Sequence, residues 1–410
     1  MSENNIGEQG KNVAARCRSA IRSIVKDVIL GIILPFVYFC AAKRSLACNK
    51  VVFLESKQEK MPDSFETLYC ALEKCGDYNL LYISLGQHRV PRFTYFVHCV
   101  HALREIATAE YVFLNDASDV ISCVNLRDQT KVVQLWHACG AFKKWGMSTA
   151  DLKFGGTREQ ILRHPFYKNL SLVTVSSPEV VWAYAEAMGL EKQRDIIKPL
   201  GVSRTDVFFS EAFILRARAH VQDLFPQTKN KKVILYAPTF RGRVSKASGP
   251  DRLDIDGLRK TLSKDYVLLI KHHPFVRDHP AVPKDCDGFA FDVSGAIEIE
   301  DLLCVADVCI TDYSSIVFEY SLFERPMLFF AYDKGDYDDW RGFYYNYEEF
   351  VPGPIFENNE DLIEYLVHLD ERYDGEKVTK FRQRFMSSCD GHATDRIVRE
   401  VFGTDKNGFS

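Results

Sequence analysis

The feature that most constrains the fold of this chain is a repeated unit, in which a short apolar run ends in a polar turn and is followed by residues spaced as on a helix. The clearest copy lies between Asp307 and Tyr320, where the run Val308–Ile310 predicts a buried parallel strand and helical spacing begins after Asp312. Further apolar runs alternate with amphipathic stretches from Lys50 onward. This alternation is typical of doubly wound α/β folds with parallel sheets.

The apolar runs form two groups on either side of a polar, helix-favouring segment at residues 210–230. The first group predicts strands at 51–54, 80–84, 111–114, 132–136 and 172–175, with helices at 65–75, 93–107 and 179–188. The second predicts strands within 232–242, 266–274, 308–310 and 325–333, and helices at 361–369 and 377–402. Because 410 residues can form two cores, we expect a basic and apolar segment at 1–45, domains at 46–208 and 209–385, and a C-terminal helix and tail at 386–410.

Charge and cysteine usage exclude several classes of protein. The net charge of −4 argues against a protein that coats nucleic acid through bulk charge. The twelve cysteines include no Cys-x-x-Cys pair, and several fall inside apolar runs. They are therefore expected to be reduced core residues of a cytosolic protein, and no zinc site or disulfide framework is predicted.

The N-terminal segment combines basic and apolar residues. Basic residues at positions 11, 16, 18, 22 and 26 precede the apolar run Val28–Ala42, which Lys43 and Arg44 follow. This run contains Pro35 and is shorter than the about 20 residues that a membrane span needs. We expect a helix that lies in or dips into the inner leaflet, with its basic residues on anionic headgroups. The alternative is an apolar helix packed on the first domain.

One turn of the first domain carries candidate catalytic chemistry. A strand runs into Trp136 and His137, and a helix is expected to start near Gly140 with Lys143 and Lys144 on its first turns. Ligands of open α/β sheets bind beyond the carboxyl ends of the strands, where His137 is expected. A histidine is the usual group for taking a proton from a hydroxyl. A structural histidine is the alternative, and the lysines could equally form a solvated face or contact membrane headgroups.

Two loops have open interpretations. In the loop at 199–206, Arg204 either pairs with Asp206 as a structural contact, which we favour, or reaches the cleft. The aromatic loop at 341–354 either walls a nucleotide base or ribose, or is only a packed surface loop.

Polar side chains follow the strands of the second domain. They are Thr239 and Arg241, then Lys271, His272 and His273, and finally Asp312, Ser314 and Ser315. Since the carboxyl ends of parallel strands share one edge, these groups predict a pyrophosphate site, with simple helix capping by Asp312 and the serines as the alternative. The adjacent histidines should point to opposite faces, so one metal ion cannot easily use both, and no metal site is predicted.

Several of these stretches together resemble one enzyme family. They are Trp136-His137-x-x-Gly140 with Lys143-Lys144, Tyr236-Ala-Pro-Thr-x-Arg241, His273-Pro274, Ile310-Thr-Asp-Tyr-Ser-Ser315, Arg325-Pro326 with Tyr332-Asp333, Arg341-Gly-Phe-Tyr344 and Pro352-Gly-Pro354. In this order, over about residues 50–400, the chain resembles the CDP-glycerol glycerophosphotransferases, the primases and polymerases of teichoic acid synthesis and their relatives in capsule assembly.

The resemblance implies a GT-B architecture, with two Rossmann-like domains facing across a cleft and a membrane-associating N-terminal helix. It implies that an acceptor hydroxyl attacks the β-phosphorus of CDP-glycerol or CDP-ribitol and releases CMP, without a cofactor. The acceptor would be a lipid-linked saccharide or a growing polymer, and the enzyme would lie peripherally or monotopically on anionic lipids at the cytoplasmic side of the cell membrane.

The resemblance also implies roles for individual residues. His137 would be the base, and His273 would act with the donor-binding residues. The donor-binding set is Thr239, Arg241, Lys271, Asp312, Ser314, Ser315 and Glu319, in which Asp312 would organise the turn. The residues for acceptor or membrane contact are Gly140, Lys143 and Lys144.

The chain departs from the family pattern at two places. His137-Ala138-Cys139 stands where His-Gly-Thr is usual, and Ser203 replaces a proline. Two alternatives therefore stay open, namely a GT-B glycosyltransferase with another nucleotide donor and a non-catalytic relative that binds nucleotide or polymer. The sequence also leaves open the alditol, the choice between priming, polymerising and capsule roles, and whether the protein is a homo-oligomer.

Overall fold

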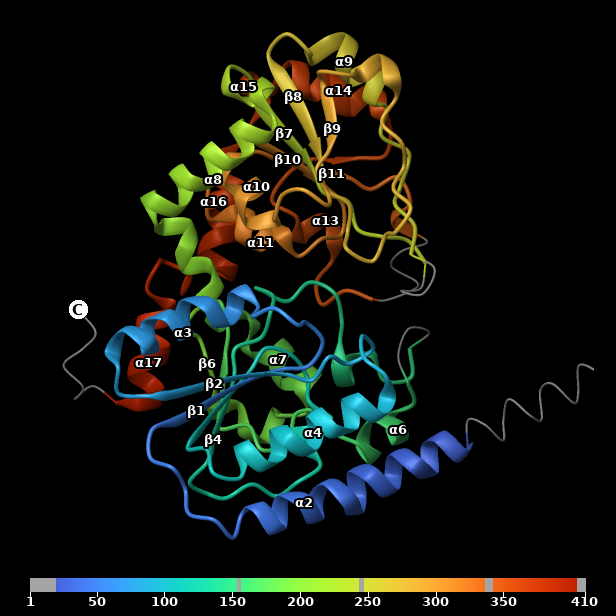
Figure 1. Cartoon of the computed structure of the whole chain (residues 1–410). Helices are drawn as coiled ribbons and strands as arrows, with labels where there is room; N and C mark the ends of the chain where they lie inside the picture. Colours follow the sequence, from blue (N-terminus) through green and yellow to red (C-terminus); the bar gives the residue numbers. More distant parts are fainter. Residues whose placement is uncertain (1–19, 153–155, 243–246, 336–341, 404–410) are drawn as a thin grey trace, which may run out of the picture. The chain divides into compact units, whose positions relative to one another are not determined.

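The computed structural model describes residues 20–152, 156–242, 247–335 and 342–403 (Figure 1). These residues form two compact units. The first contains the described residues up to Trp136 together with Arg158–Val173, and the second contains His137–Thr157 and the chain from Thr174 onward. The residues with His137 therefore belong to the same unit as the second sheet.

The first sheet has the strand order β2-β1-β3-β4-β5-β6. Its strands are β1 (Lys50–Glu55), β2 (Asn79–Ser84), β3 (Tyr111–Leu114), β4 (Lys131–Gln134), β5 (Leu172–Thr174) and β6 (Ile197–Lys198). The strands from β2 to β5 pair in parallel. The central strands β1 and β3 are buried along their whole length, which explains their unbroken apolar runs.

Helices of the first unit include α3 (Asp63–Cys75), α4 (Arg92–Ile106), α5 (Asp119–Ser122) and α6 (Arg158–Arg163). In α3, Phe65, Leu68 and Leu72 recur at helical spacing and are fully buried. The helix ends at Gly76, whose φ of +71° is the left-handed conformation that glycine adopts most readily.

The N-terminal helix is longer than the apolar run predicts. It runs from Ala20 to Ala41, 22 residues, and includes a π turn η1 (Ile29–Ile33) before α2 (Leu34–Ala41). The helix continues through the charged residues Lys26 and Asp27, which pair with Asp119 and with Arg163 of the same unit. By length and composition alone, this helix could cross a membrane.

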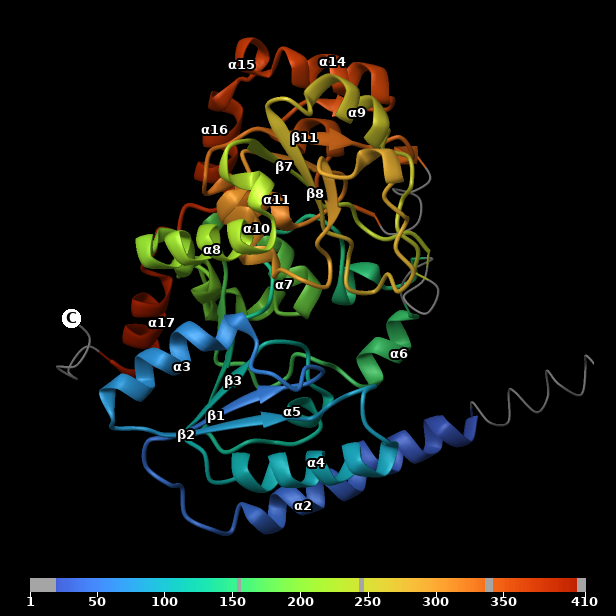
Figure 2. The same ribbon diagram turned by 45° about the horizontal axis from the view of Figure 1, so that its top comes forward.

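One face of this helix packs on the first unit. Leu34, Tyr38 and Ala41 are buried, and Tyr38 Oη accepts a hydrogen bond from the Arg127 N–H at 3.1 Å. Both ribbon views show α2 running beside α4 (Figures 1 and 2). The basic residues Lys11, Arg16 and Arg18 of the N-terminal segment lie outside the described residues.

The second sheet has the order β12-β11-β10-β7-β8-β9, and all its pairs are parallel. Its strands are β7 (Lys232–Tyr236), β8 (Tyr266–Ile270), β9 (Ala290–Asp292), β10 (Val308–Thr311), β11 (Met327–Phe330) and β12 (Ile355–Phe356). The order reverses between β7 and β10. Ligands of open α/β sheets bind beyond the carboxyl ends of strands at such a switch point.

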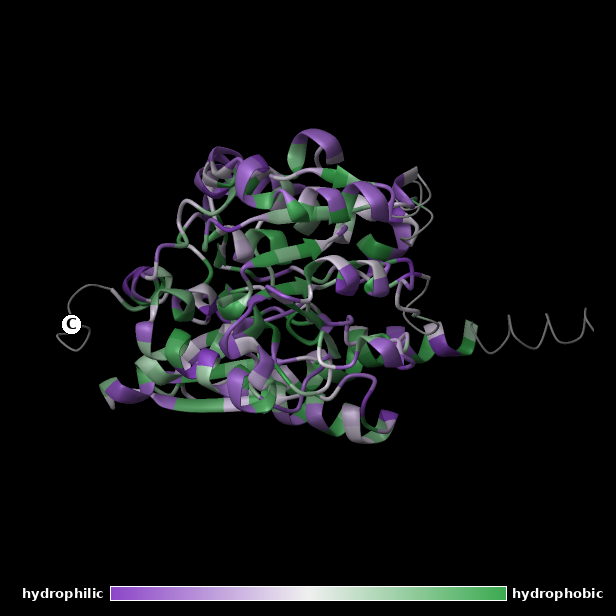
Figure 3. Ribbon diagram, turned by 90° about the horizontal axis from the view of Figure 1, so that it is seen from above, coloured by the Kyte–Doolittle hydropathy of each residue, from purple (hydrophilic) through white to green (hydrophobic). Residues whose placement is uncertain are grey.

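The helices of the second unit include α7 (Val181–Met188), α8 (Glu211–Leu224), α9 (Ile255–Leu262), α10 (Ile299–Val305), α11 (Ile316–Ser321), α14 (Asn359–Val367), α16 (Gly375–Phe385) and α17 (Ala393–Phe402). In α9, Leu258 and Leu262 join the core formed by β7, β8 and β10. Strands are mostly hydrophobic and helices alternate in hydropathy along their length (Figure 3). The structure confirms the predicted α/β class with two parallel sheets.

Candidate active site

Asp312 connects the two strands at the switch point. It follows β10, and its carboxylate is only 2% exposed. Its Oδ1 accepts hydrogen bonds from the Thr239 N–H at 2.8 Å, the Thr239 hydroxyl at 2.9 Å and the Tyr313 N–H at 2.6 Å. Its Oδ2 lies 2.9 Å from Arg241 Nη1. These contacts connect the turn after β10 to the segment after β7, and the role of Asp312 as organiser of the turn stays a prediction.

Arg241 is held by two carboxylates. Besides Asp312, it binds Asp333 through Nε at 2.5 Å and Nη2 at 3.0 Å. Its guanidinium also lies 5.3 Å from the ring centroid of Tyr313. Burial lowers the pKa of Arg241, but Asp312 and Asp333 outweigh this and raise its pKa above the ordinary value. The arginine is therefore a permanent cation at this edge, already balanced by two aspartates.

The serines lie at the start of α11. Ser315 is exposed and Ser314 is half-buried, with its hydroxyl 3.4 Å from the Ile316 N–H. Both therefore lie on the same edge of the sheet as Arg241 and Asp312, as the strand pattern predicts.

The two adjacent histidines lie in different surroundings. His272 is buried, and its ring lies 4.9 Å from that of His279, which pairs with Asp292 at 2.7 Å. Burial lowers the pKa of His272. The ring of His273 packs instead on Phe240. This separation is what an extended backbone predicts.

The hydrogen bond at His273 fixes its neutral tautomer. Its Nδ1 accepts from the Phe275 N–H at 3.1 Å, so the proton of the neutral ring is on Nε2. In this form His273 can donate a hydrogen bond through Nε2. Among the described residues, no group of three His, Cys, Asp or Glu side chains could hold a metal ion.

Lys271 has a structural position. Its ammonium donates to the backbone oxygens of Ser294, at 2.9 Å, and Ile297. Burial lowers its pKa. Lys271 therefore fixes the segment after β9, a contact that strand pairing alone could not predict.

The expected helix near Gly140 is absent from the described chain between β4 and η2 (Gly146–Thr149). Gly140 has a φ of +62°, and a Cβ there would lie 2.1 Å from the Phe318 ring. Its N–H donates to the Ser176 hydroxyl at 3.0 Å instead of to a helical carbonyl. The left-handed φ of Gly140 is incompatible with a right-handed helix at this position. The side chain of His137 is exposed.

The aromatic loop packs against the residues that follow His137. The ring of Phe142 stacks on Phe343 at 4.9 Å and on Phe350 at 4.7 Å. Lys143 forms a β-bridge with Phe343, and the Lys144 N–H donates to Gly342 O at 3.1 Å, so neither lysine lies on a helix. The described part of the loop is thus a packed segment, while Arg341 lies outside the described residues.

The same aromatic loop also reaches the Asp312 turn. The Tyr347 hydroxyl donates to the backbone oxygen of Asp312 at 3.0 Å. The loop therefore joins the segment after His137 to the turn that holds Arg241, which periodicity could not reveal.

Arg204 does not pair with Asp206, in contrast to the favoured interpretation. The Asp206 carboxylate accepts from the backbone N–H groups of Ala393 and Thr394, at the start of α17. Arg204 binds the backbone oxygen of His137 and the carboxylate of Glu300, and Glu300 is a residue that the sequence analysis missed.

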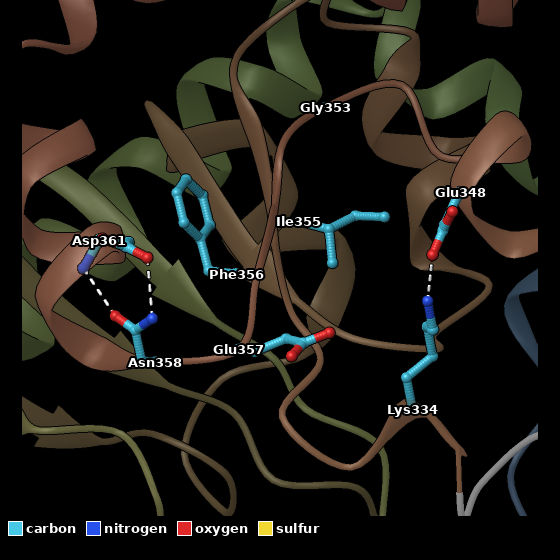
Figure 4. Close-up of a pocket in the computed structure, with 8 residues that line it drawn as sticks. All are labelled: Lys334, Glu348, Gly353, Ile355, Phe356, Glu357, Asn358 and Asp361. Carbon is cyan, nitrogen blue, oxygen red and sulfur yellow. Dashed lines mark hydrogen bonds and ion pairs between the residues drawn. The ribbon is translucent and has the colours of Figure 1, made fainter.

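A cavity of about 520 Å³ lies beside the edge strand β12 (Figure 4). Four of its polar side chains form two pairs, Lys334 with Glu348 and Asn358 with Asp361. None of the predicted site residues lines it. We therefore assign the candidate site to the switch point and not to this cavity.

Comparison with known proteins identifies the family. The model of the CDP-glycerol:poly(glycerophosphate) glycerophosphotransferases matches residues 36–403. The chain is 34% identical over 354 residues to the teichoic acid ribitol-phosphate primase of Bacillus spizizenii, covering 85% of this chain and 90% of that protein. It is 30% identical over 398 residues to the teichoic acid glycerol-phosphate transferase of Staphylococcus aureus, covering 92% and 100%.

Longer relatives match over part of their length. Identity to the teichoic acid ribitol-phosphate polymerase TarL of Staphylococcus aureus is 39% over 302 residues, which cover 73% of this chain and 52% of that protein.

The solved structure of the wall teichoic acid polymerase TagF is similar with a TM-score of 0.74 and 25% identity, covering 95% of this chain and 97% of that one. The chain therefore belongs to the CDP-glycerol:poly(glycerophosphate) glycerophosphotransferase family, as its motifs predict, and is a phosphotransferase enzyme that moves an alditol phosphate from a CDP-alditol to a polymer.

Proposed function

We propose that the chain transfers ribitol phosphate from CDP-ribitol to a hydroxyl of a lipid-linked saccharide or growing teichoic acid. The observation that carries the chemistry is that the second unit holds an exposed histidine, His137, together with Arg241 and Ser315 beyond the strand ends at the sheet switch point. The choice of ribitol is supported by relatives named for ribitol phosphate, which are 34–39% identical, whereas those named for glycerol phosphate are 29–31% identical.

In the proposed reaction, the His137 imidazole removes the proton of the acceptor hydroxyl as its oxygen attacks the β-phosphorus of the donor. The bond between this phosphorus and the CMP oxygen breaks, a phosphodiester forms, and CMP leaves with the bonding electron pair. Negative charge grows on the phosphate oxygens, where Arg241, His273 Nε2–H and the Ser315 hydroxyl are suited to stabilise it.

The test of this proposal is CMP release by purified full-length protein in detergent. CDP-ribitol, CDP-glycerol and a UDP-sugar are compared, each with and without a lipid-linked saccharide acceptor. We expect acceptor-dependent CMP release that is fastest with CDP-ribitol and is lost in His137→Ala, while His392→Ala, at an exposed histidine outside the site, retains it.

Three results would count against parts of the proposal. Faster turnover of CDP-glycerol would show that the donor carries glycerol instead of ribitol. Turnover of the UDP-sugar alone would support the glycosyltransferase alternative. Binding of CDP-alditols without turnover of either would support the non-catalytic alternative.

We also propose that the N-terminal helix attaches the enzyme to the cytoplasmic membrane surface without spanning the membrane. The apolar residues exposed on this helix and on α4 are Ile21, Ile24, Val25, Val28, Ile32, Ile33, Phe36, Phe39, Phe93 and Val97. The opposite side of the helix is paired with its own unit through Lys26 and Asp27, which supports a helix that lies in the interface. Flotation with vesicles containing phosphatidylglycerol tests this, and binding to neutral vesicles alone would contradict the predicted role of anionic lipids.

A further inference from the structure

The turn at Gly201 and the 3-10 helix η5 (Ser203–Phe209) that follows it form a fixed support for one arginine, Arg204. Gly201 turns the chain with a φ of +91°, and a Cβ there would lie 2.2 Å from the backbone oxygen of Ser388. The Asp206 carboxylate accepts from the first two N–H groups of α17, at 3.0 and 2.7 Å. Arg204 lies between these two attachment points, so its backbone position is determined on both sides.

The guanidinium of Arg204 connects three segments of the second unit. Its Nη1 donates to the backbone oxygen of His137 at 2.8 Å, and its Nη2 donates to Glu300 Oε1, on α10, at 2.7 Å. The Glu319 carboxylate, on α11, lies 3.7 Å from Nη1. The side chains are 12%, 17% and 4% exposed for Arg204, Glu300 and Glu319, so the group is largely removed from water.

We propose that Arg204 is the positioning residue of His137. The inference rests on the proposed function, because it concerns how the base is held. Two nitrogens of the planar Arg204 guanidinium donate to the backbone oxygen of His137 and to the carboxylate of Glu300 on α10. These two hydrogen bonds fix the backbone of His137 relative to α10. Lysine carries the same charge but is a single flexible ammonium, and it cannot reproduce a planar fork.

This role goes beyond stabilising the fold. Buried ion pairs often stabilise a protein no more than well-packed apolar residues of similar size. A buried ion pair such as that of Arg204 is therefore weak evidence that the arginine serves to stabilise the fold. Here the arginine also bonds the backbone oxygen of His137, the residue whose exposed imidazole is the proposed base. Glu300 and Glu319 orient the guanidinium, and both lie on helices that pack beside the second sheet.

The first test is steady-state kinetics of Arg204→Lys in the full-length enzyme. We expect kcat to fall about 10- to 100-fold, since a misplacement of about 1 Å costs rate on that scale. We expect the KM for the CDP-alditol to change by less than about twofold, because donor binding does not involve His137. The matched control is Arg325→Lys, an arginine that bonds the backbone oxygens of Cys304 and Ala306 far along the chain from His137. An equal loss of kcat in both variants would overturn the proposal.

The second test is a double-mutant cycle with His137→Ala. If Arg204 acts through His137, the doubly substituted enzyme should have the same residual rate as His137→Ala alone. A further loss of about tenfold or more on adding Arg204→Lys would show that the arginine acts independently of the base and would refute the inference.

A third measurement separates failure of this inference from failure of the proposed function. The NMR signals of the His137 imidazole, assigned by their absence in His137→Ala, should shift in Arg204→Lys and stay in place in Arg325→Lys. This comparison needs no turnover, so it decides the positioning role even if no CDP-alditol is a substrate. Unchanged His137 signals in Arg204→Lys would overturn it.

Discussion

Asp312→Asn tests whether the buried carboxylate organises the switch point or takes part in the chemistry. The substitution keeps the shape of the side chain. The amide oxygen can still accept from Thr239 and Tyr313 in place of Oδ1. The amide nitrogen, however, would replace Oδ2 and meet Arg241 Nη1 at 2.9 Å, so that two donors face each other.

The expected cost follows from this geometry. One short ion pair is lost, and its contribution is taken to be similar to that of a charge-assisted hydrogen bond, about 1.5–3 kcal/mol. Asp333 still balances Arg241, so the full cost of leaving a buried charge without compensation does not apply. We therefore expect the free energy of unfolding to fall by about 2–3 kcal/mol and Tm to fall by about 2–4 °C. Because Arg241 and the serine turn shift together, kcat should fall by about 100-fold.

Urea unfolding and CMP release measure the two effects. The matched control is Asp307→Asn at the opposite end of β10, where a carboxylate oxygen accepts from the Val233 N–H at 2.7 Å. We expect this control to lose stability and to keep its kcat. Unchanged stability of Asp312→Asn together with lost activity would refute the organising role and indicate an acid. An equal loss of kcat in the control would show that the effect is not local to the site.

Three further predictions concern packing, pH and membrane attachment. Gly140→Ala places a Cβ 2.1 Å from the Phe318 ring at a positive φ, so it should lower the free energy of unfolding by about 2–5 kcal/mol, and the added change Phe318→Leu should restore part of this in urea unfolding. Burial lowers the pKa of His272, so near pH 6.5 this imidazole takes up a proton in the unfolded chain but stays neutral in the folded protein. The free energy of unfolding should therefore fall as the pH drops below about 6.5. The Tm of His272→Gln should depend less on pH over that range. Phe36→Ser with Phe39→Ser removes two rings that are 65% and 62% exposed, which should weaken flotation with anionic vesicles by at least about tenfold and leave CMP release in detergent unchanged.

The local pattern of the sequence predicts the sheets and one edge of the site. Unbroken runs such as Val308–Ile310 have the composition of strands buried on both faces, and parallel strands share one carboxyl edge. For this reason Thr239, Arg241 and Asp312 could be expected together before any contact was known, and the structure places them within hydrogen-bonding distance. Only local periodicity and the geometry of a parallel sheet are needed for this inference.

Contacts between distant segments depended on the tertiary structure. The sequence predicts a helix after Gly140, but this residue has a φ of +62° and packs against Phe318 in a conformation that a right-handed helix cannot adopt. It also favours pairing of Arg204 with Asp206, whereas the arginine binds His137 and the aspartate binds the start of α17. Periodicity describes neighbours a few residues apart along one element, and it carries no information about which side chains of separate elements meet. The strand edges that we propose for the chemistry were therefore determined by the sequence itself, whereas the position of the exposed histidine was decided only when the chain packed.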